Sequence, residues 1–533
     1  MKRVVGSLVA AAVLATPAAG AVPAPQQIST DPFTDPAAQH ATAVEPDSFS
    51  FGNSVVAVFQ VGRRATGGAS GIGFATSHDG ARSWTRGVLP LPAGVSLTFV
   101  SDPAIAYDRV HGVWIASVLG GRAIADGVAT SLLASHSTDG VSWTTTVVDP
   151  DRGHALHDKN WIACDNGASS PRAGRCYTAW TAPSGEQSVL GLATSDDGGQ
   201  TWSRTVFDDV RGFGVFPLVR PNGTLVVLGA TGENGDSRIE AVSSTDGGRS
   251  FAAPATVAAL RVRAVSGLRL PPFHSAEIAQ DGRIFVAWPD CRYRGACSSN
   301  DIVYSSSSDG QRWTTPLRVP TGALGGRDHV LPGLAVDATT ARARTRLALT
   351  FYALSPAGCR ATACSFEPFF VSSPDAGRSW SPPQRLEPAA PADSFPLAGA
   401  RFAGDYISTS FVAGGTAVPV FAWASAPFDG QFHEGVYATA IAPLAATPAV
   451  QLGAPRVRVA TRLGVRASAR PVAGARVVCR ASVGRRALRL VSARLANGTA
   501  TCTWRRTRGR VTGSIQLVAP EGRATRTFGV RIR

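Results

Sequence analysis

A short motif occurs six times in this chain of 533 residues, and it limits the possible folds more than any other feature. Each copy has a serine, an aspartate two positions later, a few small or polar residues, and then an aromatic side chain. Intervals of 60, 58, 49, 63 and 66 residues separate successive aspartates, which suits one four-stranded sheet for each copy. The copies are Ser77 to Trp84, Ser137 to Trp143, Ser195 to Trp202, Ser244 to Phe251, Ser307 to Trp313 and Ser373 to Trp380.

Each copy has the composition of a tight hairpin turn. The aspartate carboxylate can accept hydrogen bonds from backbone N–H groups of the turn, and glycine provides the left-handed conformation that closes it. Alternating strands precede the copies, as in residues 72–76 and 302–305, and β-rich segments follow them. The motif therefore predicts an all-β fold of repeated hairpins.

The motif resembles the Asp box, or bacterial neuraminidase repeat, of sialidases and related β-propellers. The resemblance covers most of residues 45–445, and it implies a propeller whose boxes lie between the third and fourth strands of a blade, opposite the ligand-binding face. Strands are also predicted near residues 405–411, 418–423 and 435–441, which follow the sixth copy without a box. We therefore predict seven blades, with six as the alternative, and a strand between Gln26 and Thr34 that closes the last blade.

Changes in composition divide the chain into segments. Residues 1–21 have a basic start, an apolar run and an Ala19-Gly20-Ala21 cleavage pattern, which predict a secretory signal peptide and a secreted, extracellular protein. Residues 22–44 are an N-terminal segment, residues 45–445 the propeller, residues 446–455 a linker, and residues 456–533 a small immunoglobulin-like β-sandwich. No later stretch is long and apolar enough to predict a membrane span.

The C-terminal segment carries the positive charge of the protein. Between Arg456 and Arg533 there are 19 arginines, no lysine and a single acid, Glu521. This charge suits an anionic cell-surface polymer as partner. Nucleic acid is not expected, because specific nucleic-acid motifs are missing and the predicted compartment makes that partner unnatural. The alternative is that arginine simply covers the outer faces of the strands.

Eight cysteines lie in four close pairs along the sequence. An export signal favours disulfides, and the spacing within the pairs is not that of a metal site. The predicted disulfides are Cys164–Cys176, Cys291–Cys297, Cys359–Cys364 and Cys479–Cys502. The second and third close small rings between the second and third strands of their blades, where they either stiffen a binding rim or only stabilise the loops. Neither a metal nor a cofactor is expected.

The residues that open the innermost strands should surround a central pocket on the face opposite the boxes. Lys159 is the one lysine apart from Lys2, which marks it either as a ligand contact or as an ion-pair partner of Asp158 or Asp102. We predict catalytic roles for Asp102, Asp158 and Tyr406. The predicted substrate-binding residues are Lys159, Trp161, His274, Arg292, Arg327, Asp328, His329 and Asp405.

The residues give the sialidase resemblance only partial support. Sialidases hold the sugar carboxylate with three arginines and use a tyrosine nucleophile, but their N-terminal arginine motif is absent, since Arg63-Arg64-Ala65 lacks its proline. Tyr406 lies about where the family places its tyrosine. Its neighbour Asp405 points to the opposite face of the strand, so buried packing is the alternative role of Tyr406.

These observations predict a secreted, sialidase-like propeller that binds or acts on carbohydrate at its central pocket. If it is an enzyme, it is a glycoside hydrolase of the exo-α-sialidase type. The alternative is a non-catalytic extracellular adhesion platform, tethered by the basic C-terminal segment. The sequence contains no motif of serine hydrolases, zinc proteases or nucleotide-binding proteins.

Overall fold

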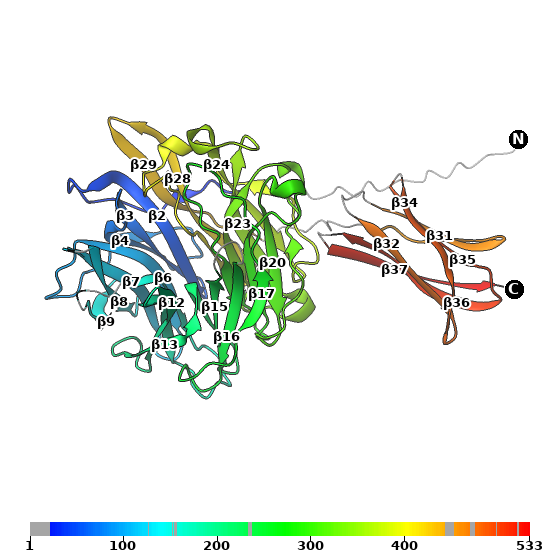
Figure 1. The fold of residues 1–533 in the computed structure, drawn as a ribbon, viewed down its shortest axis with the longest axis horizontal. Coiled ribbons are helices and arrows are strands. Elements are labelled where there is room, and N and C mark those ends of the chain that lie inside the picture. The colour runs from blue at the N-terminus through cyan, green and yellow to red at the C-terminus, as the bar shows by residue number, and fades with distance from the viewer. Residues whose placement is uncertain are drawn as a thin grey trace, which may run out of the picture.

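The computed structural model describes residues 22–125, 127–151, 153, 157–232, 237–442, 452–469, 475–496, 498–519 and 522–532. The predicted signal peptide and most of the predicted linker lie outside the described residues. The described chain is all-β, with antiparallel sheets (Figure 1). Its helices are short 3-10 turns at Gly295–Cys297, Gly322–Leu324, Arg342–Arg344, Ala361–Ala363, Ala392–Ser394 and Ala413–Gly415. None of the described helices has the length and apolar character needed to cross a membrane.

Up to Ala438, the described strands form antiparallel groups of four in which, apart from two short strands described below, neighbours in the sequence are neighbours in the sheet. The first three groups are β2 (Ala38–Phe51), β3 (Ser54–Arg64), β4 (Ala69–Ser77) and β5 (Thr85–Val88); β6 (Phe99–Asp108), β7 (Val113–Ile124), β8 (Gly127–Ser137) and β9 (Thr144–Asp149); and β10 (Asp158–Cys164), β11 (Cys176–Ser184), β12 (Gln187–Ser195) and β13 (Ser203–Arg211). A single pair, Ala69 with Val100, joins the first two groups.

The next groups continue the same order along the chain. They are β14 (Phe213–Val219), β15 (Leu225–Thr231), β16 (Arg238–Ser244) and β17 (Ala255–Ala259); β18 (Ser275–Ile278), β19 (Ile284–Asp290), β20 (Asp301–Ser307) and β21 (Leu317–Arg318); and β22 (His329–Val336), β23 (Leu347–Ser355), β24 (Ser365–Ser373) and β25 (Gln384–Arg385), with β26 (Ala390–Pro391) also on β24. The last group is β27 (Ser408–Val412), β28 (Thr416–Phe428), β29 (Gln431–Ala438) and β1 (Gln26–Gln27).

The first strands of these groups surround a common cavity. β2, β6, β10, β14, β18, β22 and β27 contact one another in this order, and β27 contacts β2 again. They line a cavity of about 690 Å³. Apolar side chains fill the space between neighbouring sheets, as where Ile115 and Leu132 of the second group pack with Trp180 and Val189 of the third.

A strand from the start of the chain completes the last group. Gln26 pairs with Ala438 and Gln27 with Tyr437, so that β1 becomes the fourth strand beside β29. The segment 22–44 also contains the beginning of β2, which starts at Ala38. The N-terminal residues therefore contribute to both the first and the last sheet.

The six motif copies occupy equivalent turns, each between the third and fourth strands of its group. In the first turn, Asp79 Oδ1 accepts hydrogen bonds from the backbone N–H groups of Arg82 and Ser83, both at 3.0 Å. Its Oδ2 accepts a hydrogen bond from the Ser83 hydroxyl at 2.6 Å. The predicted backbone hydrogen bonds are confirmed there and in the other turns, at Asp139, Asp197, Asp246, Asp309 and Asp375.

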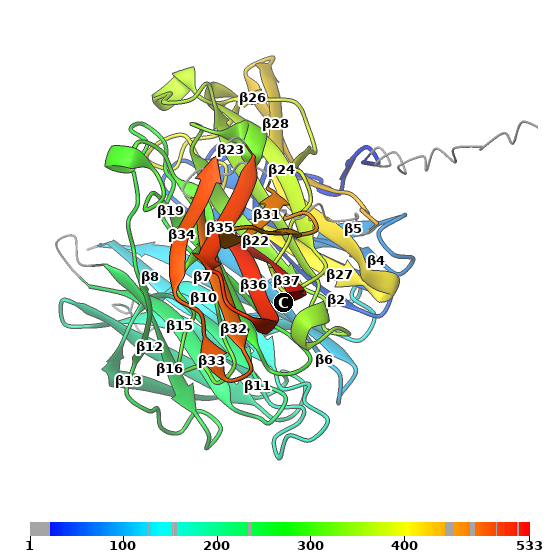
Figure 2. The same ribbon diagram turned by 90° about the vertical axis from the view of Figure 1, so that its right-hand side faces the viewer.

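The strands after residue 452 form two further sheets (Figures 1 and 2). A core that includes Leu463, Trp504 and Ile515 lies between them. The disulfide Cys479–Cys502 connects the two sheets, and the other three predicted disulfides are also present. In sheet order, the strands are β30 (Arg456–Val459), β31 (Arg462–Ser468), β35 (Thr499–Arg505) and β34 (Leu490–Ala496), then β33 (Arg486–Ala487), β32 (Arg476–Val483), β36 (Gly509–Ala519) and β37 (Gly522–Ile532).

Candidate functional site

Three charged residues lie at the same place on the innermost strands of the first three sheets. Glu45, Asp102 and Lys159 each occupy a break in register with the second strand, and their φ angles are 55°, 47° and 51°. A bulge re-aims a side chain, and the left-handed backbone is unfavourable for residues other than glycine. Strained backbone of this kind concentrates at functional sites. The strained backbone marks this end of the cavity as the candidate site. It lies opposite the turns that contain the six motif copies, which we call the box turns.

Lys159 lies at the centre of a group of carboxylates. Its Nζ is 2.5 Å from Asp405 Oδ2, 3.6 Å from Asp102 Oδ1 and 3.9 Å from Glu45 Oε1, and its side chain is only 10% exposed. The backbone N–H of Lys159 donates to Asp158 Oδ1 at 2.9 Å. Burial alone would lower the pKa of Lys159, but the carboxylates, Asp102 foremost, raise it well above its ordinary value. Lys159 is therefore the fixed positive charge of the site.

Asp405 also binds an arginine. Arg269 Nε lies 3.1 Å from Asp405 Oδ1 and Arg269 Nη2 lies 2.6 Å from Asp405 Oδ2, which is the two-pronged geometry that suits a carboxylate. The backbone N–H of Asp405 donates to Glu45 Oε1 at 3.0 Å. The guanidinium groups of Arg269 and Arg63 both lie over the Phe402 ring, at 4.6 and 4.8 Å from its centroid. We refer to Glu45, Asp102, Asp158, Lys159, Arg269 and Asp405 as the Lys159 cluster.

The carboxyl groups of the Lys159 cluster differ in how readily they ionise. Burial alone would raise the pKa of Asp405, but Lys159 and Arg269 lower it below its ordinary value. Burial raises the pKa of Glu45 to about 7, and burial together with the charge of Asp102 raises that of Asp158 to about 6. Near neutral pH, one small site thus holds an ionised carboxylate and carboxyl groups that gain and lose protons. Such a division is typical of acid–base catalysis.

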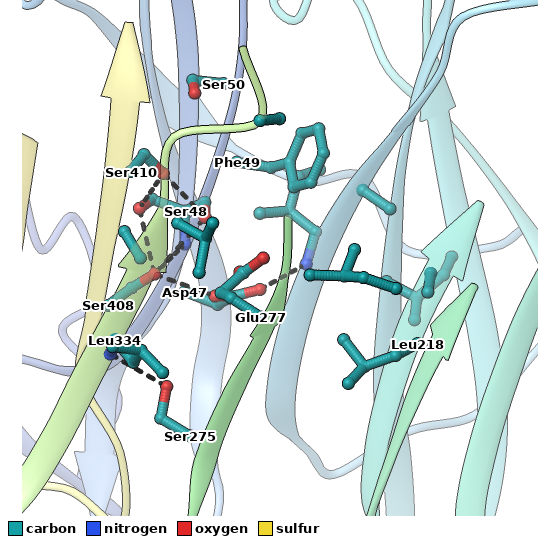
Figure 3. A pocket seen from close by; sticks show the side chains of 18 of the residues that line it. Asp47, Ser48, Phe49, Ser50, Leu218, Ser275, Glu277, Leu334, Ser408 and Ser410 are labelled. Atoms are coloured by element: carbon teal, nitrogen blue, oxygen red, sulfur yellow. Dashed lines mark hydrogen bonds between the residues drawn. The ribbon is translucent and has the colours of Figure 1, made fainter. Parts of the chain in front are cut away.

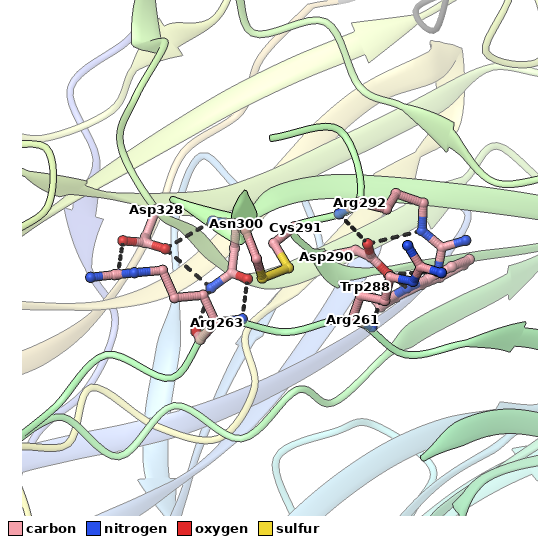
Figure 4. Close-up of a disulfide and its surroundings, with 9 residues drawn as sticks. Arg261, Arg263, Trp288, Asp290, Cys291, Arg292, Asn300 and Asp328 are labelled. Atoms are coloured by element: carbon pink, nitrogen blue, oxygen red, sulfur yellow. Dashed lines mark hydrogen bonds and ion pairs between the residues drawn. A yellow bond between two sulfur atoms is a disulfide. The ribbon is translucent and has the colours of Figure 1, made fainter. Parts of the chain in front are cut away.

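A long connection, residues 260–274, brings Arg269 to this site; we call it the strap. Two loops closed by disulfides hold the strap in place. The N–H of Cys291 donates to the Arg261 carbonyl, and the N–H of Ala361, inside the Cys359–Cys364 loop, donates to the Ser266 carbonyl, both at 2.7 Å. Figure 4 shows the first of these loops beside the strap. The tight disulfides therefore support a segment of the candidate site.

Four predicted substrate-binding residues do not line the cavity: Arg292, Arg327, Asp328 and His329. Asp328 instead binds the strap, through Arg263 Nη1 at 2.5 Å (Figure 4). His329 is fully buried, and burial lowers its pKa to about 3. Arg292 and Arg327 form ion pairs with Asp290 and Glu367, at 2.6 and 3.0 Å. These residues support the strap and its surroundings.

The other predicted residues lie at or beside this end of the cavity: Asp102, Asp158, Lys159, Trp161, His274, Asp405 and Tyr406. The Trp161 ring stacks on Phe216 at 4.6 Å and packs edge-on against Tyr406 at 5.1 Å. The Tyr406 hydroxyl donates to the Pro103 carbonyl at 3.2 Å. Burial, followed by the charges of Glu45 and Asp102, raises the pKa of Tyr406 well above its ordinary value. This direction disfavours a tyrosinate nucleophile and suits an aromatic wall.

His274 lies at the same end of the cavity, and burial lowers its pKa to about 4. Its Nε2 is buried without a hydrogen-bond partner among the described residues. At neutral pH, His274 is therefore an uncharged part of the wall.

Two acids further along the cavity were not predicted from the sequence. Asp47 and Glu277 approach each other from β2 and β18 (Figure 3). Asp47 Oδ2 accepts a hydrogen bond from the Ile105 N–H at 2.9 Å, and Oδ1 accepts one from the Ser408 hydroxyl at 3.1 Å. Burial raises the pKa of Asp47 to about 7 and that of Glu277 to about 8, and Asp47 contributes to the latter. Both are mainly protonated at pH values below 7.

Glu45 and Arg269 were also missed. Glu45 precedes Pro46, as Asp102 precedes Pro103, so a repeated acid–proline pair was available as a signal. Arg269 lies in an irregular connection and has no local signal. Within the described part of the chain, no group of three or more histidine, cysteine, aspartate or glutamate side chains is placed to hold a metal ion.

Comparisons with known proteins give matches at the level of structure. No protein-family model and no curated protein matches the sequence. Among solved structures, a Hadza microbial sialidase matches with 13% identity and a TM-score of 0.38, over 76% of this chain and 66% of that one. A Trypanosoma rangeli sialidase matches with 11% identity and a TM-score of 0.42, over 95% and 88%. An ulvan lyase matches with 10% identity and a TM-score of 0.45, over 77% and 96%.

Proposed function

We propose that this protein is a secreted, carbohydrate-directed propeller and that the Lys159 cluster is its site of action. In this proposal the groups of four strands are the blades of a seven-bladed ring with Asp-box turns, and the two C-terminal sheets are an immunoglobulin-like module. Carbohydrate binds at the end of the cavity opposite the boxes. The observation that carries the proposal is that two carboxyl groups, Asp102 and Asp158, lie beside the buried Lys159, while the pKa of Asp158 is raised to about 6.

The surroundings of the cluster suit a sugar ring. Trp161, Phe273 and Tyr406 provide aromatic faces at this end of the cavity, and Lys159 Nζ lies 5.1 Å from the Phe273 ring centroid. Aromatic faces pack against the C–H groups of sugars, while buried polar groups around them bind hydroxyls. The division of the site into an aromatic wall and a charged wall favours a carbohydrate over a wholly apolar or wholly anionic ligand.

Glycoside hydrolysis is the reaction that this geometry supports best. The reaction needs one carboxylic acid that gives a proton to the leaving oxygen and a second carboxylate that attacks or activates water. We assign the first role to Asp158, the more exposed carboxyl, whose pKa is raised to about 6. We assign the second role to Asp102, which Lys159 holds at 3.6 Å. Asp405, engaged by both Lys159 and Arg269, anchors the cations.

The same geometry bears on the exo-sialidase form of the proposal. Arg269 and Arg63 lie beside this end of the cavity, but a carboxylate already engages Arg269, and Arg63 Nη1 donates to the side-chain Oε1 of Gln60 at 3.3 Å. A sialic acid would have to share Arg269 with Asp405, whose negative charge would repel the sugar carboxylate. We therefore expect neutral glycosides to be better substrates than sialosides.

A panel of aryl glycosides, including a sialoside, tests this function. We expect one or more of the glycosides to be hydrolysed, with kcat/KM falling as the pH rises above about 6, because a general acid with a raised pKa loses its proton there. Asp158→Asn and Asp102→Asn should each reduce kcat by at least about 100-fold, whereas Tyr406→Phe should retain most activity. Arg378→Gln, in a box turn, is the matched control.

The same panel separates the enzyme from the adhesion platform. Retention of a glycan by the wild-type protein without turnover would support a binding protein, which is the second candidate, since Lys159 and Asp405 form a closed ion pair. Neither turnover nor glycan binding, in a protein shown to be folded, would contradict both.

A further inference from the structure

The outer face of the β30-β31-β35-β34 sheet is covered by arginine. On β31 and β35, buried residues alternate with outward ones, so that Leu463 and Trp504 face the core. The outward positions of the four strands carry six arginines, and all six side chains are exposed in the full chain. These residues, which we call the arginine face, are Arg456, Arg458, Arg462, Arg466, Arg494 and Arg505.

The register of the sheet places some of these arginines directly opposite one another. Arg456 pairs with Arg466 across β30 and β31, and Arg462 pairs with Arg505 across β31 and β35. Like charges at directly opposite positions of a sheet repel each other and destabilise it. The arginines of the arginine face therefore repel one another, and this repulsion reduces the stability of the sheet.

Acidic groups that could relieve this repulsion are missing from the face. Glu521 is the single acid after residue 455 and lies outside the described residues. Among the described residues, no ion pair involves a member of the arginine face. A bound polyanion would supply the missing counter-charges.

The other outward side chains indicate what kind of polyanion fits. Thr499, Thr501 and Thr503 form a hydroxyl row along β35, between the arginines of β31 and β34. The face presents no aromatic side chain, so it lacks the stacking platforms that proteins use for single-stranded nucleic acid. Rows of guanidinium forks and hydroxyls instead suit an extended chain with hydroxyls and regularly spaced carboxylates.

We propose that the arginine face is a docking surface for an acidic polysaccharide, of the class built from uronic acids. The extended polymer lies across β30, β31, β35 and β34, its carboxylates paired with arginine forks and its hydroxyls with the threonine row. This surface is separate from the Lys159 cluster and does not depend on the function proposed there. It would hold the protein on a carboxylated matrix.

The test measures binding of the full chain to polygalacturonate, with neutral dextran, dextran sulfate, duplex DNA and anionic phospholipid vesicles as comparison probes. The face variant carries Arg456→Gln, Arg462→Gln, Arg466→Gln and Arg494→Gln. The control variant loses the same charge from exposed box-turn arginines, through Arg82→Gln, Arg249→Gln, Arg312→Gln and Arg378→Gln. We expect the face variant to bind polygalacturonate at least about tenfold more weakly at about 0.1 M salt, and the control to bind within about twofold of the wild type.

Thermal unfolding of the two variants shows whether weaker binding results from a loss of stability. Because the substitutions remove like-charge repulsion, the face variant should unfold at the same temperature as the wild type or higher. Equal losses in both variants would show a general charge effect and overturn the proposal. Stronger binding of dextran sulfate, DNA or vesicles than of polygalacturonate would also overturn it, in favour of that partner.

Discussion

The aspartates of the box turns and two acids of the Lys159 cluster, Glu45 and Asp158, have opposite acid–base properties. In the turns, hydrogen bonds from Ser83, Ser142 and Ser250 hold the pKa values of their aspartates well below the ordinary range. In the cluster, burial raises the pKa values of Glu45 and Asp158. The box turns thus use ionised, solvated aspartates that stabilise the chain locally. In the cluster, Glu45 and Asp158 are buried and can exchange protons near neutral pH, while Lys159 and Arg269 keep Asp405 ionised.

The two ends also differ in how their residues are held. Each box turn satisfies its aspartate within a few residues, so the same structure can be repeated without reference to the rest of the protein. The cluster depends on contacts between distant segments: Asp405 is 246 residues from Lys159 and 136 residues from Arg269. Substitutions in the Lys159 cluster should therefore reduce stability more, and affect more distant residues, than substitutions in a box turn.

The largest effect should come from removing the central cation. Lys159→Met leaves Asp405 and Asp102 buried without their main partner, and we expect the free energy of unfolding to fall by about 3–5 kcal/mol. Urea unfolding at neutral pH measures the loss. The double variant Lys159→Met with Asp405→Asn should lose less than the sum of the two single changes, because it removes both charges. Strict additivity would show that the two groups do not interact.

The pH dependence of stability should come next in size. In the unfolded chain, carboxyl groups ionise near their ordinary pKa, whereas Asp47 and Glu277 keep their protons until about pH 7 and 8. The folded state therefore binds more protons over this range, and stability falls as the pH rises from about 5 to about 8.

The variant Asp47→Asn with Glu277→Gln should lose roughly 2–4 kcal/mol less than the wild type over the same pH change. Denaturant unfolding at both pH values provides the comparison. Glu45 and Asp158 remain in the variant and contribute in the same direction, so the dependence should shrink and not vanish. An identical loss in both proteins would contradict the raised pKa values.

Removal of a disulfide should have a smaller effect on stability, and its consequences for the strap should differ between the two ends of the sheets. Cys359→Ser with Cys364→Ser opens a small ring and should cost about 2 kcal/mol. Because this loop holds the strap, amide exchange at residues 260–274 should also become faster. The control, Cys164→Ser with Cys176→Ser, opens the disulfide that joins β10 and β11 at the end of the sheet where its box turn lies. It should leave exchange in the strap unchanged. Equal exchange in both variants would mean that the disulfide does not support the strap.

The smallest effect should be at a single box turn. Asp197→Ala removes the acceptor of two backbone N–H groups and of the Thr201 hydroxyl, and should cost about 1 kcal/mol. Asp197→Asn keeps one carbonyl oxygen and should lose less. Thermal unfolding compares the two variants. Glycan binding or turnover should stay at the wild-type level in both variants. A loss of either would show that the box turn affects the site at the Lys159 cluster.

The sequence predicted the repeated end of the sheets much better than the irregular end. A box turn is encoded within eight residues, so the hairpin at Asp79 and its copies could be predicted from the residues. Its position between the third and fourth strands followed from the resemblance to the Asp box. The four disulfides were also predicted correctly, because each joins cysteines close in the sequence.

The candidate site was only partly predictable. The bulges that turn Asp102 and Lys159 inwards could not be predicted from the sequence. The residues themselves were singled out, Asp102 because it precedes a proline and Lys159 because it is one of two lysines. The closest partner of Lys159 is Asp405, at 2.5 Å, where Asp158 or Asp102 was expected. Arg269 could not be found, because an irregular connection has no periodicity from which the direction of a side chain follows.

The pairing of β1 with β29 has a consequence for how this chain can be made. During synthesis, β1 cannot pair with β29 until residues 437 and 438 have been added. Until β1 joins it, β29 presents an unpaired edge to which other chains could add. A shortened product that lacks β1 would keep that edge open. The start of the described chain therefore joins the last of the groups of four strands only after the other groups have been synthesised.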